Sequence, residues 1–364
     1  MKTRVIKVDR DKPDPAAIEE ASAAIKAGKL VVFPTETVYG LGAHALDTAA
    51  VQKIFDAKER PSNDPLIVHI AHIGQVSLCA IGMPPGARKL ALSFWAGPLT
   101  LILKKKPEVP DLVTAGLDSV ALRVPAHRVA RALMEMAGVP VAAPSANRFS
   151  RPSPTTAAHV IEDLDGRVDV ILDAGPTDIG LESTIVDFTV DPPVIRRPGG
   201  ITFEQVHSLV PEVEVAEGHA TGDEPQVAPG QLTRHYAPNA QMTLYEGPFD
   251  RVIKRIAADA RTEVARGNRV GILAPEEDLS ALAPLIAPSA SAGRIETRPI
   301  GARGDVDRAG RELFAAIRAL DATGVSVILA SSLGSEGLAR AIRDRLMRAA
   351  DGRIRTIVQD SKSD

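Results

Sequence analysis

Residues 30–42 read LVVFPTETVYGLG, and they set the pattern for the first half of the chain. Leu30–Phe33 are four apolar residues in a row, enough for one buried strand, and they follow a helical pattern over 14–27. Pro34 ends the strand, and residues 35–37 then place hydroxyl and carboxyl groups at its carboxyl end. Such groups are well placed to bind a small polar ligand, although a turn capped by its own threonines would explain them equally well.

The segments around this strand predict an α/β domain with a mixed sheet. Further helices are expected near 48–57, 84–95, 127–136 and 155–163. Further strands are expected near 66–70, 99–103, 119–124, 141–143, 169–172, 183–187 and 194–196. Because several of these strands follow one another with no helix between them, a mixed sheet with helices packed on it fits better than a doubly wound parallel sheet.

The last third of the chain predicts a second, smaller α/β domain with a Rossmann-like parallel sheet. Strands at 242–245, 269–273, 295–299 and 325–330 alternate there with helices at 250–266, 305–320 and 337–349. The segment before it is acidic and rich in Gly and Pro, without a helical or strand period, as in a linker. We therefore divide the chain into domains at 1–212 and 241–364, joined by a linker at 213–240.

The composition excludes several classes of protein. A chain of 364 residues, 45% hydrophobic and 24% charged, is typical of an ordered protein with two domains. With 43 basic against 46 acidic residues, the formal charge of −3 argues against a surface that binds nucleic acid throughout. Cys79 is the only cysteine, which excludes an internal disulfide and a cysteine-based zinc site. No apolar run approaches the roughly 18 residues of a membrane span, and we expect a cytoplasmic protein.

The common nucleotide-binding and hydrolase motifs are missing from the sequence. There is no P-loop, no H-E-x-x-H and no G-x-S-x-G. Gly40-Leu41-Gly42 loosely fits a dinucleotide-binding loop, but these glycines begin seven residues after the strand ends. That loop needs its glycines at the strand-to-helix turn, so we do not expect dinucleotide binding here.

Lys58 and Arg60 form a small basic cluster. Pro61 disfavours the helical conformation for Arg60, so the helix should end here. Residues two apart in an extended segment point the same way, which would let these two cations converge on a phosphate chain. A solvated basic helix end that favours the helix dipole is the alternative.

A polar run follows the strand at 141–143 and precedes a helix. Residues 144–156 read PSANRFSRPSPTT, with Ser153 or Thr155 as the expected N-cap of that helix. Hydroxyls and backbone N–H groups at a helix start favour an anion.

Two charged or titratable groups interrupt apolar strands. Arg123 lies in one of them and needs an anionic partner. His69 lies in another, where a hydrogen-bonded core histidine would be ordinary.

Together these motifs occur in the order and approximate spacing of the YrdC-like domain, and the chain resembles the long, two-domain threonylcarbamoyl-AMP synthase family. They are FPTETVYGLG (33–42), KERP (58–61), PSAN (144–147) with a following SPT (153–155), ESTIVD (182–187), RRPGG (196–200) and the linker motif APGQLTRHYAP (228–238). The resemblance implies that L-threonine, bicarbonate and ATP are joined into threonylcarbamoyl-adenylate, with Mg²⁺ accompanying ATP and pyrophosphate released. A separate transferase complex then passes the threonylcarbamoyl group to tRNA.

The resemblance also assigns roles to individual residues. The L-threonine site would comprise Thr35, His69, Arg123, Ala143 (through its backbone) and Ser183. Lys58 and Arg60 would be the catalytic cations on the triphosphate. The rest of the ATP site would comprise Ser119, Ser145, Asn147, Ser153, Arg197 and Tyr236, the last on a linker that closes as a lid.

Two other functions remain open at this point. Single-domain relatives have been regarded as RNA-binding modules, and a local basic patch would allow a weak contact with tRNA. The carbamoyl-transfer domain of hydrogenase maturation has a similar fold, but it belongs to longer chains with further zinc-binding portions.

Overall fold

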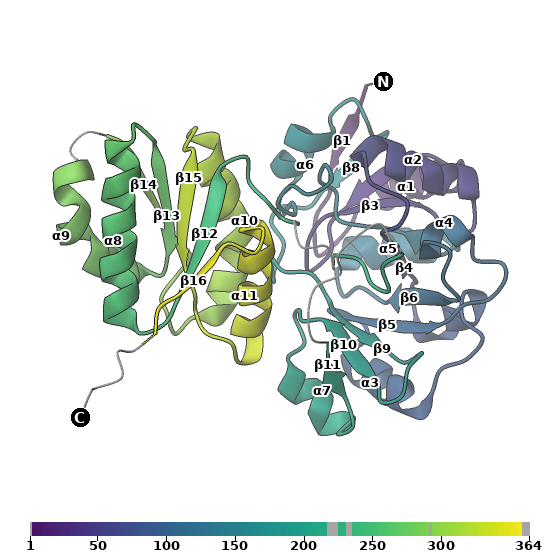
Figure 1. The fold of residues 1–364 in the computed structure, drawn as a ribbon. Helices are drawn as coiled ribbons and strands as arrows, with labels where there is room; N and C mark the ends of the chain where they lie inside the picture. The colour runs from purple at the N-terminus through teal and green to yellow at the C-terminus, as the bar shows by residue number, and fades with distance from the viewer. Residues whose placement is uncertain (1, 217–224, 231–234, 291–292, 359–364) are drawn as a thin grey trace. The chain divides into compact units, whose positions relative to one another are not determined.

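The computed structural model describes residues 2–216, 225–230, 235–290 and 293–358. The chain divides into two compact units, one made of 1–149 with 153–232 and the other of 150–152 with 233–364. Each unit has its own sheet, so each is considered by itself (Figure 1).

The first unit is built on an eleven-stranded mixed sheet, which confirms the predicted fold class. Its strands, in spatial order, are β1 (Arg4–Lys7), β8 (Val170–Asp173), β2 (Val31–Phe33), β3 (Gly40–His44), β7 (Val141–Ala142), β4 (Ile67–His69), β6 (Ser119–Arg123), β5 (Leu99–Lys104), β9 (Thr184–Asp187), β10 (Val194–Arg197) and β11 (Glu214–Val215). Its helices are α1 (Pro15–Lys26), α2 (Thr48–Lys58), the 3₁₀ helix η1 (Ile73–Leu78), α3 (Pro85–Phe94), α4 (Asp111–Thr114), α5 (Arg128–Ala137), α6 (Ala157–Leu164) and α7 (Phe203–Leu209).

The glycines of residues 40–42 lie in a strand that the sequence did not predict. β3 pairs with β2 in antiparallel register, so Gly42 lies opposite Val31. A Cβ at Gly42 would lie 2.7 Å from the Phe33 ring and 2.9 Å from Val141. These glycines therefore allow close packing within a sheet, and their low strand propensity hid the strand from pattern analysis.

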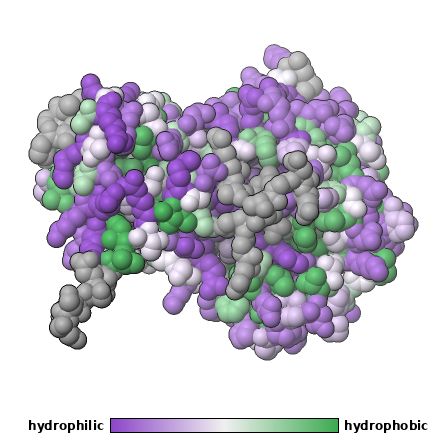
Figure 2. Space-filling view, in the orientation of Figure 1, coloured by the Kyte–Doolittle hydropathy of each residue, from purple (hydrophilic) through white to green (hydrophobic). Residues whose placement is uncertain are grey.

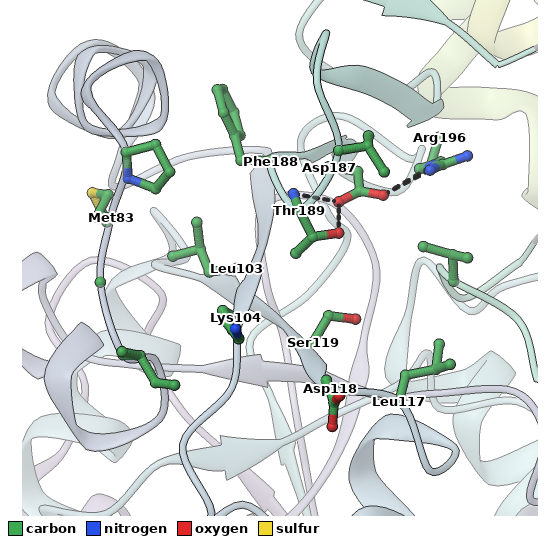
Figure 3. A pocket seen from close by; sticks show the side chains of 15 residues that line it. Met83, Leu103, Lys104, Leu117, Asp118, Ser119, Asp187, Phe188, Thr189 and Arg196 are labelled. Atoms are coloured by element: carbon green, nitrogen blue, oxygen red, sulfur yellow. Dashed lines mark hydrogen bonds and ion pairs between the residues drawn. The ribbon is translucent and has the colours of Figure 1, made fainter.

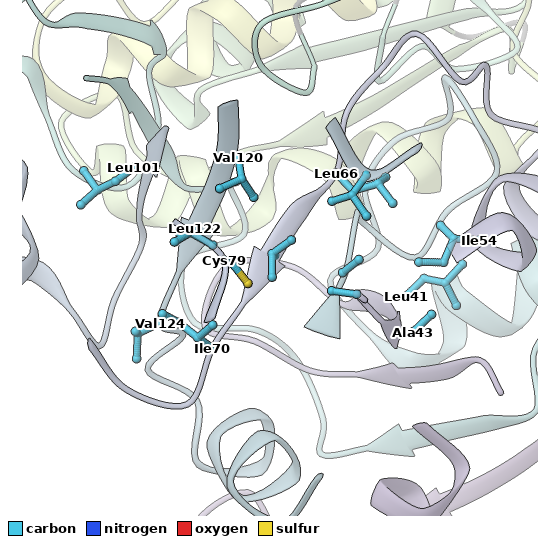
Figure 4. Close-up of a cluster of buried hydrophobic side chains, with 14 of the residues drawn as sticks. Leu41, Ala43, Ile54, Leu66, Ile70, Cys79, Leu101, Val120, Leu122 and Val124 are labelled. Atoms are coloured by element: carbon cyan, nitrogen blue, oxygen red, sulfur yellow. The ribbon is translucent and has the colours of Figure 1, made fainter. Parts of the chain in front are cut away.

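The main apolar core covers one face of this sheet. The alternate side chains of the same strands point to the opposite face, which can therefore carry polar groups. Val120 and Leu122 of β6 point into the core, together with Leu101 and Val68 from neighbouring strands (Figure 4). Cys79 is buried there, and burial raises the pKa of its thiol to about 11. Because side chains alternate along a strand, Ser119, Ala121 and Arg123 face the other side of the sheet.

The second unit has the parallel, Rossmann-like sheet that the sequence predicted. Its strands, in spatial order, are β14 (Ile295–Pro299), β13 (Val270–Ala274), β15 (Val327–Ser331), β12 (Gln241–Glu246) and β16 (Ile354–Thr356). Its helices are α8 (Phe249–Ala265), α9 (Glu276–Ala290), α10 (Val306–Ala322) and α11 (Gly337–Ala349). The sequence did not predict α9, because Pro284 and Pro288 interrupt its helical pattern.

The predicted linker is partly structured. Residues 214 and 215 form the edge strand β11, and Ala228 is fully buried in the first unit, whereas 217–224 and 231–234 lie outside the described residues. The face shown in Figure 2 is largely hydrophilic, with hydrophobic residues in small patches. Among the described helices, none is long and apolar enough to cross a membrane.

The packing around Gly42 yields a prediction about stability. Gly42→Ala should lower the free energy of unfolding by about 1–3 kcal/mol, because the new methyl group overlaps the Phe33 ring and Val141. Urea unfolding monitored by circular dichroism measures the change. Gly82→Ala is the matched control, because a Cβ there meets nothing within 4 Å. Equal stability of the two variants would contradict the packing argument.

Candidate functional site

Four of the predicted site residues, His69, Ser119, Arg123 and Arg197, lie on strands of the mixed sheet and face the side opposite the core. The register pairs Ile67 with Ala121, and it pairs both His69 and Thr100 with Arg123. These side chains therefore lie side by side on that face. We call it the ligand face, and it consists of the outward side chains of β4, β5, β6, β9 and β10.

Arg123 finds the anionic partner that the sequence required, and the partner is Glu36. Arg123 donates from Nη2 to Glu36 Oε1 at 2.6 Å and from Nε to the Gly97 carbonyl at 3.2 Å. The second oxygen of Glu36 accepts from the Ala126 N–H at 3.0 Å. Both side chains of the ion pair are buried. Glu36 therefore holds the loop between β2 and β3 against the carboxyl end of β6.

Thr35 in the same loop forms the capped turn that the sequence also allowed. Its Oγ1 donates to the Val38 carbonyl at 2.6 Å and accepts weakly from the Thr37 and Val38 N–H groups. It also lies 2.8 Å from Thr37 Oγ1. Because Thr35 is only 2% exposed, its hydroxyl is positioned by the turn.

His69 is buried on the ligand face without a full set of hydrogen bonds. It is 3% exposed, and its Nδ1 has no partner among the described residues. Burial lowers the pKa of the imidazole to about 3, and the positive Arg123 beside it contributes. The ordinary expectation of a hydrogen-bonded core histidine holds in part, because the ring interacts with the backbone of Ile67 and Val141 and only Nδ1 lacks a partner among the described residues. The ring is neutral at pH 7 and retains one nitrogen for a ligand.

A chain of hydrogen bonds runs from the strand beside Arg123 across to Arg197. Thr100 Oγ1 lies 2.7 Å from Ser183 Oγ, and both side chains are fully buried. Arg197 donates from Nη2 to Ser183 Oγ at 3.3 Å and to the Ser183 carbonyl at 3.0 Å. Its Nη1 donates to the Pro229 carbonyl at 3.2 Å. Ser183 thus lies between the neighbourhood of Arg123 and a buried guanidinium.

Lys58 ends α2 with its charge buried. It is 1% exposed, and its Nζ donates to the carbonyls of Ser145 and Asn147 at 2.6 and 2.5 Å. Burial lowers the pKa of this ammonium well below its usual value, and the positive Arg60 lowers it further. Backbone carbonyls carry only partial charge, so an anion beside Lys58 would stabilise it further.

The sequence predicted an extended segment in which Lys58 and Arg60 point the same way. The structure does not have this arrangement. Glu59 between them is the C-cap of α2, with a left-handed φ of 56°. Arg60 instead donates to the carbonyls of Asp64 and Pro65 and forms an ion pair with Asp64 at 2.9 Å. The two cations are still close enough to interact electrostatically.

Asp64 is the centre of a buried cationic cluster. It is fully buried, and burial raises the pKa of its carboxyl. Arg60, Lys58 and Arg197 each oppose that shift by their positive charge. Three cations therefore lie around this carboxylate, and the buried carboxylate of Asp163 also acts on Lys58, so an anionic ligand would add to a cluster that is already partly balanced. We call Asp64 and these three cations the cationic cluster.

The polar run that follows β7 contributes two further buried groups. Ser153 donates to Glu182 Oε1 at 2.5 Å and is fully buried. Asn147 donates from its side chain to the Arg148 carbonyl at 2.7 Å. The helix α6 is capped by Thr156, whose Oγ1 accepts from the His159 N–H. The expectation of Ser153 or Thr155 as N-cap is wrong, because α6 begins later than predicted.

Ala143 and Ser145 lie where β7 leaves the sheet. The Ala143 N–H donates to the Ile67 carbonyl at 2.9 Å, and Ser145 forms an isolated bridge with Gly40. These contacts place the polar run between β3 and β4, beside the cationic cluster.

Residues 225–230 pack across the middle of the ligand face. Ala228 is fully buried in a small apolar cluster with Ile67, Ile102, Ala121 and Ile185. The Gln226 N–H donates to the Asn63 carbonyl at 2.9 Å, and the Gly230 backbone lowers the pKa of the Asp64 carboxyl against the effect of burial. This strap, as we call residues 225–230, therefore covers the face between Arg123 and the cationic cluster.

A cavity of about 760 Å³ opens at the other end of the ligand face, around Ser119 (Figure 3). Its walls are mainly apolar and include Leu103, Leu117 and Phe188, and Val227 of the strap also lines it. At the rim, Asp187 accepts from Thr189 and Arg196, as the dashed lines show. The size and mixed lining suit a ring system with a few polar atoms.

Tyr236 belongs to the second unit. It is 1% exposed and packs 5.2 Å from the Phe314 ring, with the Arg345 guanidinium 5.4 Å from its centroid. The neighbouring His235 N–H donates to the Arg348 carbonyl. The expected role of Tyr236 at the ATP site stays a prediction.

Sequence reasoning missed three carboxylates that position the predicted ligand residues. Glu36 binds Arg123, Asp64 binds Arg60, and Glu182 accepts from Ser153. The sequence did contain a signal for these carboxylates. Each lies in or next to a recognised motif, and a buried arginine needs an acidic partner.

Comparison with known proteins agrees with this geometry. A family model described as "Telomere recombination" (Sua5_yciO_yrdC) matches residues 23–199, and one described as "Threonylcarbamoyl-AMP synthase, C-terminal domain" matches 201–351. The threonylcarbamoyl-AMP synthase of Pyrococcus abyssi is 42% identical over 95% of this chain and 97% of its own length. The chain belongs to the threonylcarbamoyl-AMP synthase family. The corresponding synthase of Bacillus subtilis is 43% identical, over 93% and 94% of the two chains.

Solved structures of the synthase family share the fold. A crystal structure of P. abyssi Sua5 complexed with L-threonine has a TM-score of 0.89 at 41% identity, and the match covers 98% of this chain and all of that one. A second P. abyssi structure, with histidine and tyrosine replaced by alanine at adjacent positions, has a TM-score of 0.88 at 40% identity and covers 99% of both chains.

The buried imidazole of His69 makes stability depend on pH. Its pKa is about 3 in the folded chain and 6.5 when exposed, so only the unfolded chain binds the proton between these values. Stability should therefore fall as the pH drops from about 6.5 towards 3, by up to roughly 1.4 kcal/mol per pH unit from this group. Urea unfolding of wild type and His69→Gln across this range measures the difference. Parallel curves for the two proteins would show that His69 is not held neutral.

The Glu36–Arg123 pair should be essential to the first unit. Glu36→Gln removes the charge that neutralises Arg123 and should cost roughly 3 kcal/mol of unfolding free energy. Glu20→Gln is the matched control, because it removes the exposed partner of Arg4 and should cost under about 1 kcal/mol. Chemical unfolding of both variants tests this, and similar small effects would mean that Arg123 does not depend on Glu36.

Proposed function

We propose that the chain is a nucleotidyltransferase that joins L-threonine, bicarbonate and ATP into threonylcarbamoyl-AMP and releases pyrophosphate. The observation that carries this proposal is the ligand face, where Arg123 and His69 lie at one end and the cationic cluster and a cavity lie beyond the strap. Arg123 can bind the carboxylate of an amino acid, and the cationic cluster can bind a polyphosphate. The family membership and the threonine-bound relative support the same assignment.

Threonine is assigned to the end of the face that holds Arg123. The guanidinium is fixed by Glu36 and the Gly97 carbonyl, which leaves its remaining nitrogen for the substrate carboxylate. The neutral His69 and the buried Ser183 hydroxyl suit the substrate's hydroxyl or carbamate oxygen. Thr35 would bind from the loop above, and Ala143 through its backbone.

The triphosphate of ATP is assigned to the cationic cluster. Lys58, Arg60 and Arg197 surround Asp64, with Asp163 also near Lys58, and a polyphosphate would bring further negative charge to these three cations. Ser145, Asn147 and Ser153 lie on the polar run that Lys58 binds through two carbonyls.

The nucleoside is assigned to the cavity beside Ser119. Its apolar walls suit a purine, and the strap beside it carries Val227 over the opening. The Arg197 contact with Pro229 ties the strap to the cationic cluster, so phosphate binding and strap closure involve the same guanidinium. Closure would keep water from a labile adenylate. Tyr236, a few residues along the chain, is proposed to help close the site.

The reaction then follows from charge placement. The threonine amine and bicarbonate form a carbamate with loss of water, and a carbamate oxygen attacks the α-phosphorus of ATP. The bond from the α-phosphorus to the bridging oxygen breaks, and pyrophosphate leaves with its electrons. The cations stabilise the charge that accumulates on the transferred and leaving oxygens. No general base is assigned, because the carbamate itself supplies the nucleophilic oxygen.

Mg²⁺ is proposed to enter with ATP. No group of three or more His, Cys, Asp or Glu side chains able to hold a metal occurs among the described residues. That fits an ion whose main ligands are phosphate oxygens and water, with at most one or two carboxylates. When bound, Mg²⁺ would neutralise polyphosphate charge alongside Lys58 and Arg60.

The product requires an acceptor. We propose that a separate threonylcarbamoyl-transferase complex consumes it in the cytoplasm to modify adenosine in tRNA. Any contact of this chain with tRNA itself is then weak and secondary.

Lys58→Met tests the assignment of the phosphate site. The variant keeps the aliphatic length and removes the charge, and kcat/KM for pyrophosphate release should fall by about 100-fold or more, the equivalent of roughly 2–4 kcal/mol. Lys53→Met, on the exposed side of the same helix, should keep wild-type activity. Thermal unfolding of both variants shows whether the fold is retained.

The assay itself tests the reaction. Pyrophosphate release from Mg–ATP should require both threonine and bicarbonate when each is omitted in turn. Release that ignores both substrates would disprove the proposed synthase reaction, and wild-type activity of Lys58→Met would disprove the phosphate assignment alone.

A further inference from the structure

A second cleft, of about 670 Å³, opens in the second unit at the carboxyl ends of β12 and β15. Its walls come from the end of β12, the first turn of α8, the loop that follows β15, and the side chains of Arg303 and Arg343. None of these residues belongs to the ligand face, so the cleft is a separate feature of the chain.

The topology of the parallel sheet makes this position special. β12 and β15 are neighbours, but the chain leaves them towards opposite faces of the sheet. α8 follows β12 and packs with α9 on one face, whereas α11 follows β15 and packs with α10 on the other (Figure 1). The two loops therefore diverge and leave a crevice. In open α/β sheets, such switch points are where ligands bind.

The loop at 332–336 offers donors for an anion. It reads SLGSE and leads into α11, whose N-cap makes no side-chain hydrogen bond, so the first N–H groups of this helix remain available. Gly334 has a left-handed φ of 111° with open space around its Cβ position, so the backbone conformation alone requires glycine. Ser332 and Ser335 add hydroxyls on the cleft side.

A buried hydroxyl adjoins this loop and is independent of the helix end. Ser331, the last residue of β15, is 1% exposed, and its Oγ has no hydrogen-bond partner among the described residues. It lies in register with Tyr245, which lines the cleft. Buried hydroxyls are ordinarily satisfied, so Ser331 is a polar group beside the cleft, next to the lining residue Ser332, that the described residues leave without a partner.

Two arginines are held at the walls of the cleft. Arg303 forms an ion pair with the buried Asp278 and donates to the Ser332 carbonyl at 3.2 Å, which ties it to the loop. Arg343 donates to both oxygens of Glu246, at 2.6 and 2.9 Å. Both arginine side chains are about one-third exposed, at 36% and 34%, and each nitrogen of the Arg303 guanidinium already has an acceptor. Their carboxylate partners fix the orientation of the two guanidinium groups.

The remaining wall suits a flat ring. Phe249 begins α8 and is 41% exposed, a large value for an aromatic residue next to a cleft. Val252 lies one turn further on, and Tyr245 forms the floor at the end of β12. Glu246 presents carboxylate oxygens that could accept from sugar hydroxyls.

We propose that this cleft binds a phosphate-bearing ligand of the mononucleotide class. The phosphate lies on the loop at 332–336 and the start of α11, near Arg303 and Arg343. The ring packs against the exposed side of Phe249, whose ring also has the Arg303 guanidinium 5.6 Å from its centroid. The residues that line the cleft all belong to the second unit, so binding here is distinct from binding of ATP at the cationic cluster.

Hydrogen–deuterium exchange of the full-length chain, resolved by peptide, tests this proposal. AMP should slow exchange in peptides covering both 332–340 and 246–252, whereas inorganic phosphate should protect only 332–340 and adenosine should protect neither strongly. Ser335→Glu adds a negative charge to an exposed loop position and should weaken the AMP effect by at least about tenfold. Ser280→Glu, an exposed serine on α9, is the matched control and should bind AMP as wild type does.

The outcomes separate this site from the first one. Protection of 58–64 reports binding at the cationic cluster and is read independently. Absence of AMP protection at 332–340, or equal protection in Ser335→Glu, would overturn the proposed cleft site even if 58–64 responds. If phosphate and AMP bind with equal affinity and protect the same peptides, the assignment of the ligand to the mononucleotide class is wrong.

Discussion

The organisation of the first unit depends on the burial of Arg123 at the end of a central strand. An uncompensated guanidinium in that position would be very costly, and Glu36 from a distant loop neutralises it. The contact holds the loop after β2 against the carboxyl end of β6, and it orients the buried guanidinium of Arg123 next to His69. The same requirement recurs around Asp64, where Lys58, Arg60 and Arg197 surround the carboxylate and Asp163 also acts on Lys58. The ligand face is therefore a surface where the protein's own charges are only partly balanced.

Much of this arrangement could be predicted from the sequence, and the exceptions have physical causes. The mixed and parallel sheets followed from apolar runs and their spacing. Several motif residues lie on or beside the ligand face, whereas Tyr236 belongs to the second unit. β3 was missed because glycines have low strand propensity, although here they fit under the Phe33 ring. α9 was missed because two prolines break its pattern.

The relative direction of the Lys58 and Arg60 side chains could not be predicted from their two-residue spacing in the sequence. A left-handed Glu59 separates them, and this conformation is uncommon for a residue other than glycine. Glu59 is supported by ion pairs with Arg148 and Arg167, residues far away in sequence. The pairing of Arg123 with Glu36 and of Ser153 with Glu182 likewise depends on tertiary contacts, which no local pattern encodes.

The strap has a consequence for the timing of substrate entry. It is held to the ligand face by the buried side chains of Gln226 and Ala228, by the Gln226 N–H bond to the Asn63 carbonyl, and by the Arg197 contact with the Pro229 carbonyl. Opening of such a segment is a local unfolding event, which takes place in microseconds to seconds. Access to the ligand face therefore depends on the local stability of the strap, so a change that weakens its packing would speed substrate entry and loosen the closed site together.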